Sequence, residues 1–216
     1  MKKEIIICGT GGFAAELTEY IEHNNLNSKV HIKIIGYLDV DKQNYLRYGY
    51  KAPFLGSEQE YTFKQRTIVF VAIGDSKIRQ KIINILTEKN VLFDNFIHHS
   101  CIVSSSSIVG KGNIICPNVI IGPNTKIGNF NILNYSCAIP HDCEMGNMNI
   151  LSPNVYITGY CKIGDNNFFG VSSGCTPSLK IGSNNKIQAG IILNINVEDN
   201  NIVFSMNKIK KMKLYK

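Results

Sequence analysis

The segment IICPNVIIGPNTKIGNFNIL (residues 114–133) places an aliphatic side chain at every sixth position. Stepping by six in both directions extends this series without interruption from residue 97 to residue 193. All seventeen positions are apolar: Ile97, Val103, Val109, Ile115, Ile121, Ile127, Leu133, Ile139, Met145, Leu151, Ile157, Ile163, Phe169, Cys175, Ile181, Ile187 and Leu193. Because the surrounding sequence is rich in Asn, Ser and Gly, chance does not explain the series, and it indicates an internal repeat.

A second phase of the repeat supports this interpretation. Glycine often follows the apolar anchor directly, at positions 110, 122, 128, 146, 164, 170 and 182. Small side chains often lie four residues after an anchor, and these include Cys101, Thr125, Cys137, Cys143, Cys161 and Ser173. Such a pattern predicts short strands joined by turns and stacked as a solenoid, with three hexads to a triangular coil. The sequence therefore predicts a parallel β-helix over residues 96–200, in which the cysteines act as compact apolar fillers.

The first part of the chain has a different pattern. An apolar, β-prone run from Glu4 to Cys8 leads into four residues, Gly9-Thr10-Gly11-Gly12, and then into helical spacing. Further apolar stretches span residues 32–38 and 67–73, and a helix is expected from about Ser76 to Lys89. Alternating strands and helices predict an α/β domain over residues 1–95, with a small parallel sheet and right-handed crossovers.

The glycine turn between the first strand and helix is a candidate nucleotide site. Glycines there let the backbone approach a phosphate or a sugar, and the helix N-terminus offers free N–H groups. Ala14 replaces the last glycine of the dinucleotide fingerprint, but Asp39 follows the second predicted strand, where a ribose contact is expected. The alternative is a tight turn without a ligand. A complete NAD site is not expected, because fewer than 100 residues precede the hexads.

Composition limits the class of protein. The chain has 216 residues, of which 44% are hydrophobic and 18% charged, as in ordinary globular proteins. No apolar run is long enough for a membrane span or a signal peptide, so we expect a cytoplasmic protein with reduced cysteines. The net charge of +7 would attract anionic ligands or simply favour solubility. Nucleic-acid binding is not expected, because no basic face with interleaved aromatic residues appears.

One histidine has the position expected of a catalytic base. His141 lies two residues after the anchor Ile139, a phase that points outward, and Asp142 follows it. Gly159 lies one full coil later, so it should stack beside His141 at a strand spacing of about 4.8 Å. A histidine base beside a backbone N–H donor would suit acyl transfer, which needs a base and hydrogen-bond donors for the oxyanion. The alternative is an ordinary surface histidine on a turn.

A metal site is not expected. Zinc catalysis on a hexad protein requires three well-placed histidines. The β-helix region holds only His98, His99 and His141, and the 42-residue spacing from His99 to His141 is not a multiple of the 18-residue coil.

The β-helix pattern resembles the left-handed β-helix of the hexapeptide acyltransferases. With its N-terminal domain the chain is similar to nucleotide-sugar N-acetyltransferases, such as bacillosamine- and perosamine-type enzymes, and to sialic acid O-acetyltransferases. The stretches that carry the resemblance span nearly the whole chain: 9–12, 36–39, 72–75, 97–98, 134–143 (NYSCAIPHDC), 152–153 and 158–159. The resemblance implies a homotrimer that binds acetyl-CoA in grooves between neighbouring β-helices.

The resemblance also implies roles for individual residues. His141 corresponds to the general base, Asp142 to the group that orients it, and Gly159, with its neighbour Thr158, to the acetyl-CoA contact. Asn134 corresponds to a contact with the acceptor sugar. The other expected contacts are Gly11, Gly12, Phe13, Asp39 and Gly74 for the nucleotide-linked sugar and Lys208 for acetyl-CoA. Ile150 replaces a second histidine of the family.

The favoured hypothesis is an acetyl-CoA-dependent N-acetyltransferase acting on the 4-amino group of a nucleotide-linked amino-dideoxyhexose, in the synthesis of surface glycans such as O-antigen. The alternatives are an O-acetyltransferase acting on sialic acid or another sugar, and a non-catalytic trimeric binding module. Beyond the hexads, residues 201–216 form a basic tail whose lysines either approach the CoA phosphates or are simply solvated.

Overall fold

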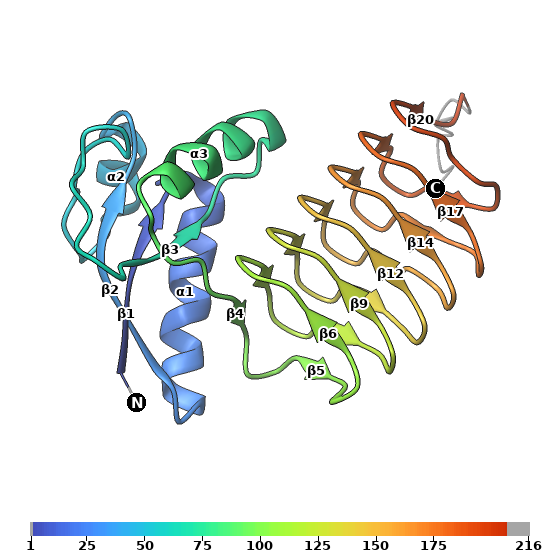
Figure 1. The fold of residues 1–216 in the computed structure, drawn as a ribbon, viewed down its shortest axis with the longest axis horizontal. Helices are drawn as coiled ribbons and strands as arrows, with labels where there is room; N and C mark the ends of the chain where they lie inside the picture. The colour runs from blue at the N-terminus through green and yellow to red at the C-terminus, as the bar shows by residue number, and fades with distance from the viewer. Residues whose placement is uncertain (1, 207–216) are drawn as a thin grey trace, which may run out of the picture.

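The computed structural model describes residues 2–206 and contains a small α/β domain followed by a parallel β-helix (Figure 1). The N-terminal sheet has the order β2-β1-β3 and is parallel throughout. Its elements are β1 (Lys2–Cys8), α1 (Gly12–Asn27), β2 (His31–Leu38), α2 (Gln43–Tyr48), β3 (Ile68–Val71) and α3 (Ser76–Glu88). The predicted strands and the two long helices are confirmed, and only the short helix α2 was not expected. Within residues 2–206, no helix has the length and apolar character needed to span a bilayer.

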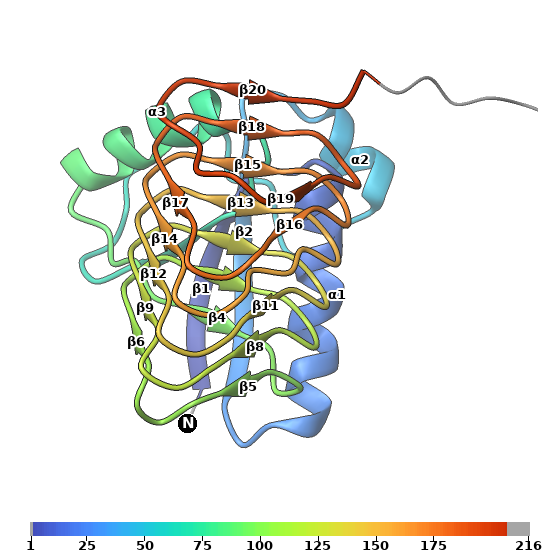
Figure 2. The same cartoon turned by 90° about the vertical axis from the view of Figure 1, so that its right-hand side faces the viewer.

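The β-helix consists of two-residue strands at the predicted spacing, one for nearly every hexad. They are β4 (Phe96–Ile97), β5 (Ile102–Val103), β6 (Ile108–Val109), β7 (Ile114–Ile115), β8 (Ile120–Ile121), β9 (Lys126–Ile127), β10 (Ile132–Leu133), β11 (Ala138–Ile139), β12 (Glu144–Met145), β13 (Ile150–Leu151), β14 (Lys162–Ile163), β15 (Phe168–Phe169), β16 (Gly174–Cys175), β17 (Lys180–Ile181), β18 (Lys186–Ile187), β19 (Ile192–Leu193) and β20 (Ile202–Val203). Strands 18 residues apart pair in parallel, so successive coils stack (Figures 1 and 2). The predicted fold class is confirmed.

Each strand ends at a corner whose backbone turns sharply. A residue with positive φ recurs every six positions, as at Asn118, Asn124, Phe130, Ser136 and Asp142. Asparagine and aspartate tolerate this left-handed conformation better than most side chains, which explains the polar composition between the anchors. The anchors themselves form one continuous buried core from Ile115 to Val197. Ile97 and Val103 are partly exposed because no coil lies beneath the first one.

The final coil is shorter than the others. Val197 bridges Ile181 and Val203 pairs with Ile187, in each case across 16 residues instead of 18. The chain therefore completes another coil after the regular hexads end at Leu193. The last strand, β20, lies within the segment that the sequence analysis assigned to the tail.

Asparagine side chains connect the coils along one corner. Asn113, Asn131, Asn149 and Asn167 are buried and recur every 18 residues. The Oδ1 atom of each asparagine accepts a hydrogen bond from the backbone N–H of the asparagine one coil later. These N···O distances are 2.7–2.9 Å for the N–H groups of Asn131, Asn149 and Asn167. This asparagine ladder satisfies backbone groups that would otherwise be buried without partners.

The three faces of the β-helix differ in the residue that precedes each anchor. On the face of β4, β7, β10 and β13 these residues are Phe96, Ile114, Ile132 and Ile150, which pack against α1 and the N-terminal sheet; we call it the docked face. Figure 2 shows α1 alongside it. Ile150, which replaces the family's second histidine, is thus buried between the domains.

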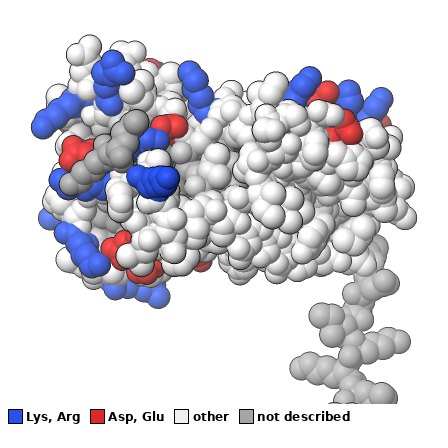
Figure 3. All heavy atoms as spheres, turned by 90° about the horizontal axis from the view of Figure 1, so that it is seen from below, with Lys and Arg blue, Asp and Glu red and all other residues white. Residues whose placement is uncertain are grey.

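Among residues 2–206, no element covers the second or the third face. The charged face, on β9, β12, β14 and β17, carries Lys126, Glu144, Lys162 and Lys180. The apolar face, on β5, β8, β11, β16 and β19, exposes Ile102 (65%), Ile120 (45%), Tyr156 (54%) and Ile192 (59%). In the view from below, charged side chains gather on the N-terminal domain and along one edge of the β-helix, which leaves a broad uncharged surface between them (Figure 3).

Candidate active site

His141 and Asp142 lie at the corner that follows β11. The Nδ1 atom of His141 is 3.0 Å from Oδ2 of Asp142. An ionised carboxylate can only accept, so Nδ1 carries the proton and Nε2 keeps its lone pair free. Asn124, one coil earlier, donates from Nδ2 to the other carboxylate oxygen at 3.2 Å. The hydrogen bonds from His141 and Asn124 hold the pKa of Asp142 below its ordinary value, so the carboxylate stays ionised beside the imidazole.

Gly159 lies directly against the imidazole, as the 18-residue coil predicts. A Cβ atom at this position would be 2.6 Å from Cε1 and 2.9 Å from Nε2 of His141, so any side chain here would displace the imidazole. Within residues 2–206, the Gly159 N–H donates no hydrogen bond, although its carbonyl accepts one from Ser178. The arrangement places the accepting nitrogen of the exposed His141 beside an unpaired backbone donor of the buried Gly159.

Two neighbours complete the surroundings of this corner. The Tyr160 ring meets His141 edge-on, with ring centroids 5.1 Å apart, and it was not expected from the sequence. Thr158 is adjacent, but its hydroxyl already donates to the Cys175 carbonyl at 2.6 Å. The Thr158 hydroxyl could therefore meet a co-substrate only as a hydrogen-bond acceptor.

The nearby cysteines are packing residues. Cys143 and Cys137 are buried in the β-helix core, and all seven cysteines are free. Burial raises the pKa of the Cys143 thiol to about 11 and that of Cys137 to about 12, so both are protonated at neutral pH. A protonated buried thiol is a poor nucleophile, which supports direct transfer without a cysteine intermediate.

The glycine turn of the N-terminal domain is fixed by Asp39. The Asp39 Oδ2 atom accepts from the Thr10 backbone N–H at 2.9 Å and from its hydroxyl at 2.6 Å. Tyr50, which the sequence analysis missed, donates from its hydroxyl to the carbonyls of Thr10 and Gly11 at 2.9 and 3.2 Å. Asp39 therefore shapes the turn, and one of its oxygens is committed to that task.

The other predicted substrate contacts lie at or near the carboxyl edge of the same sheet. Gly11 caps α1 and Gly74 follows β3, and both face open space where a Cβ would stand. Gly12 is exposed beside the Tyr48 hydroxyl, whereas Phe13 is half-buried against the core of the domain. These positions come together through the parallel sheet, which brings the ends of β1, β2 and β3 to one edge.

A cavity of about 1020 Å³ adjoins this turn, between α1, β2 and residues 48–53. Gly12, Tyr37, Tyr48 and Tyr50 are among its lining residues, and His141 is not. Asn134 follows β10 on the β-helix, where its Oδ1 accepts from the next backbone N–H at 2.8 Å. Lys208 lies outside the described residues.

Comparison with known proteins agrees with this architecture. Residues 4–86 match the family model of the PglD N-terminal domain. The acetyltransferase domain of PglB from Neisseria gonorrhoeae, solved with acetyl coenzyme A, has the same fold: it is 20% identical, with a TM-score of 0.81 over 94% of this chain and 96% of that chain. A histidine-to-asparagine mutant of perosamine N-acetyltransferase from Caulobacter crescentus, solved with CoA and GDP-perosamine, is 26% identical, with a TM-score of 0.77 over 97% of both chains.

A curated relative, an uncharacterized protein of Acanthamoeba polyphaga mimivirus, is 30% identical over 128 residues. The chain spans about a quarter of the length of that relative (24%). The fold and the His141 corner together define a two-domain hexapeptide-repeat protein with an acid-base pair on its β-helix. The match at residues 4–86 shows that the N-terminal domain is of the PglD type, and the chain as a whole shares its fold with solved sugar N-acetyltransferases.

Proposed function

We propose that the protein is an acyltransferase that moves the acetyl group of acetyl-CoA to an amino group of a nucleotide-linked sugar. The observation that carries the proposal is the corner at which the His141–Asp142 pair faces the backbone of Gly159. Two similar proteins, one solved with acetyl coenzyme A and the other with CoA and GDP-perosamine, support the choice of co-substrate and of acceptor class.

The reaction proceeds by direct attack. The amine nitrogen of the sugar adds to the thioester carbonyl carbon, and Nε2 of His141 takes the proton that this nitrogen loses. The Gly159 N–H stabilises the negative charge on the carbonyl oxygen. The C–S bond then breaks, CoA leaves as a thiolate, and the proton on His141 can neutralise it. Asp142 keeps the imidazole in the required tautomer and stabilises its charged form.

The acceptor is held by the N-terminal domain. The glycine turn, with Gly11 and Gly12 at the start of α1, offers backbone N–H groups to the phosphates of the nucleotide. Phe13, Asp39 and Gly74 surround this turn, and Asn134 contacts the sugar. We assign the acceptor position to the 4-amino group of a dideoxyhexose, which rests on the family likeness. We also place the protein in the cytoplasm.

The active unit in this proposal is a homotrimer. The apolar face exposes Ile102, Ile120, Tyr156 and Ile192, which are arranged along one side of the β-helix. A contiguous apolar strip of this kind on a rigid surface is suited to self-association. The His141 corner borders this face, so the neighbouring subunit would complete the groove for acetyl-CoA.

The test is thiol release from acetyl-CoA with UDP-, dTDP- and GDP-linked 4-amino sugars and free sialic acid as acceptors. We expect turnover with an amino sugar, and a decrease in kcat/KM of about 10² or more for His141→Asn. His31→Asn, at an exposed histidine outside the corner, is the control and should leave turnover unchanged. Turnover with sialic acid alone would establish O-acetylation instead. Wild-type protein that turns over none of these acceptors would favour a binding module.

A further inference from the structure

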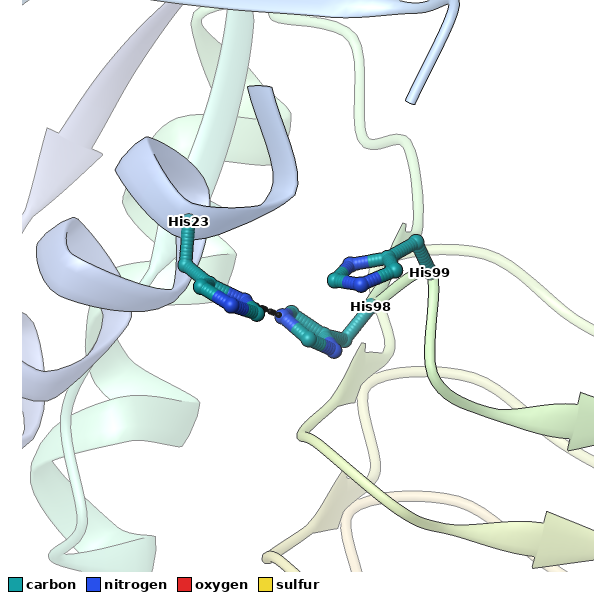
Figure 4. Close-up of side chains that lie close together, drawn as sticks. All are labelled: His23, His98 and His99. Atoms are coloured by element: carbon teal, nitrogen blue, oxygen red, sulfur yellow. Dashed lines mark hydrogen bonds between the residues drawn. The ribbon is translucent and has the colours of Figure 1, made fainter. Parts of the chain in front are cut away.

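Three histidines meet where the two domains join, although they are far apart in the sequence. His23 lies on α1, and His98 and His99 directly follow β4. Figure 4 shows the three rings grouped together, two from the first coil and one from the helix. One ring nitrogen from each histidine lies within 4.8 Å of the others, and His23 Nδ1 is 3.0 Å from His98 Nε2. We call these three residues the histidine cluster.

The backbone around the histidine cluster is held in place. The buried Asn24, next to His23, accepts a hydrogen bond from the His99 N–H at 2.8 Å. His98 is buried, whereas His23 and His99 are exposed. The first coil thus presents two imidazoles to a third on a docked helix, and the rings of His23 and His99 lie on the exposed side.

We propose that His23, His98 and His99 form a binding site for a divalent transition metal ion, with zinc as the preferred ion. Imidazole nitrogens are common zinc ligands, with Zn–N distances of about 2.0–2.1 Å. Tetrahedral geometry then requires the three nitrogens to lie roughly 3.3 Å apart. Rotation of the exposed rings that moves their nitrogens by about an ångström would bring all three within bonding distance of one ion. Water supplies the fourth ligand on the exposed side.

The surroundings of His98 support coordination. Its Nδ1 atom is 2.7 Å from the Ser100 hydroxyl, which is itself fixed by the Asn118 N–H at 2.9 Å. The Ser100 backbone N–H also donates to His98 Nδ1 at 3.3 Å, so without a metal the proton of this ring lies on Nε2. Coordination through Nε2 moves that proton to Nδ1, where the Ser100 hydroxyl accepts it. Metal-bound histidines usually have such a partner on the other ring nitrogen, and it fixes their tautomer.

The proposed site has a structural role, separate from acetyl transfer. It joins α1 of the N-terminal domain to the first coil of the β-helix, whereas the transfer reaction at His141 requires no metal. The sequence analysis considered only His98, His99 and His141 and expected no metal. His23 lies 75 residues from His98 and reaches it only through the docking of α1.

The test uses the full chain without a polyhistidine tag, stripped of metal with a chelator. Co²⁺ is added first, because its visible absorption reports four-coordinate binding, and Zn²⁺ is then added to displace it. We expect binding of one ion per chain, with affinity lowered at least about tenfold in His23→Ala and in His99→Ala. His31→Ala removes an exposed histidine outside the cluster, and it should bind as the wild type does.

Thermal unfolding provides the second measurement. Binding to the folded state alone raises the midpoint of unfolding. Zn²⁺ should therefore raise the midpoint of the wild type and of His31→Ala, but not that of either cluster variant. Without metal, His99→Ala should unfold close to the wild type because its ring is exposed. His23→Ala also removes the hydrogen bond to the buried His98, so the zinc-induced shift is compared within each variant. Equal affinity in the wild type and His23→Ala, or no binding to the wild type, would overturn the proposal and leave only a hydrogen bond between His23 and His98.

Discussion

The candidate active site depends on single residues placed one coil apart. His141 and Gly159 share a phase of the repeat, so their proximity follows from the 18-residue coil. Asn124 occupies the same phase as Asp142, one coil earlier, and its contact with that carboxylate could have been found by the same count. The contact of Tyr50 with the glycine turn could not be found in this way, because it joins residues 40 positions apart in the N-terminal domain, where no repeat relates them.

Because Gly159 has no side chain, the imidazole of His141 can lie directly against its backbone. The substitution Gly159→Ala places a methyl group 2.6–2.9 Å from the ring atoms of His141, so the ring must move. We expect kcat to decrease by about 10² or more because a displaced base no longer meets the amine. Steady-state kinetics measures the effect.

The Gly159 backbone lies outside the left-handed region, so alanine adds no backbone strain there. The midpoint of thermal unfolding should accordingly change little in Gly159→Ala. Unchanged turnover in this variant would show that His141 does not act from the observed position.

At the scale of elements, each two-residue strand is too short to be stable alone, and the coils stabilise one another through the anchors and the asparagine ladder. The ladder was not recognised in the sequence, although its signal is present: the small residue four positions after an anchor is asparagine at 113, 131, 149, 167 and 185. Sorting the hexads into three faces, instead of reading them as one series, reveals it.

A substitution in the middle of the ladder should be costly. Asn149→Ala removes the acceptor for the Asn167 backbone N–H and the donor to the Gly164 carbonyl, both at 2.9 Å. A buried donor without a partner costs about 1–3 kcal/mol, and chemical denaturation should report a loss of this size.

Asn129→Ala is the matched control. Its side chain is exposed and accepts from the Lys111 N–H, which water can satisfy after the substitution. Its effect on the free energy of unfolding should stay within about 0.5 kcal/mol. Equal losses in the two variants would mean that the ladder is no more important than a surface contact.

At the scale of the whole molecule, two surfaces of the β-helix determine the assembly. The docked face binds α1, and α3 adds a second attachment through Arg79. The buried guanidinium of Arg79 donates to the Phe130 carbonyl and, at 3.0 Å, to the Met148 carbonyl, both at corners of the β-helix. Burial lowers its pKa to about 10, so the side chain is still charged at neutral pH.

Removal of this attachment should weaken the whole chain. Arg79→Ala eliminates both hydrogen bonds and the packing of a fully buried side chain, and we expect a loss of about 2–4 kcal/mol in the free energy of unfolding. Lys81→Ala, at an exposed position of the same helix, should cost less than about 0.5 kcal/mol. Chemical denaturation of the two variants makes the comparison. If Arg79→Ala lowers the free energy of unfolding as little as Lys81→Ala does, the hydrophobic interface alone holds the domains together.

The apolar face should control self-association. Ile120→Asp and Tyr156→Asp introduce a carboxylate into the surface proposed to pair with a second copy, where burial of an unpaired charge is unfavourable. Light scattering should give a trimer mass for the wild type and a monomer mass for both variants. Lys180→Asp on the charged face should remain trimeric. A monomeric wild type would refute the homotrimer.

The sequence by itself determined the repeat. An apolar anchor every six residues and a turn-forming residue between anchors are local properties, so they specify the strands, the corners, the coil length, and with it the pairing of His141 with Gly159. The strand-turn-helix pattern of the N-terminal domain is local in the same way, and it was predicted with only α2 missing.

Only the tertiary structure decided which face of the β-helix the N-terminal domain covers, which face stays apolar and open, and how His23 meets His98. These contacts join residues that no repeat relates. Their energy comes from the fit of two separate surfaces, such as Arg79 against the corners at Phe130 and Met148, and complementarity of that kind has no period along the chain.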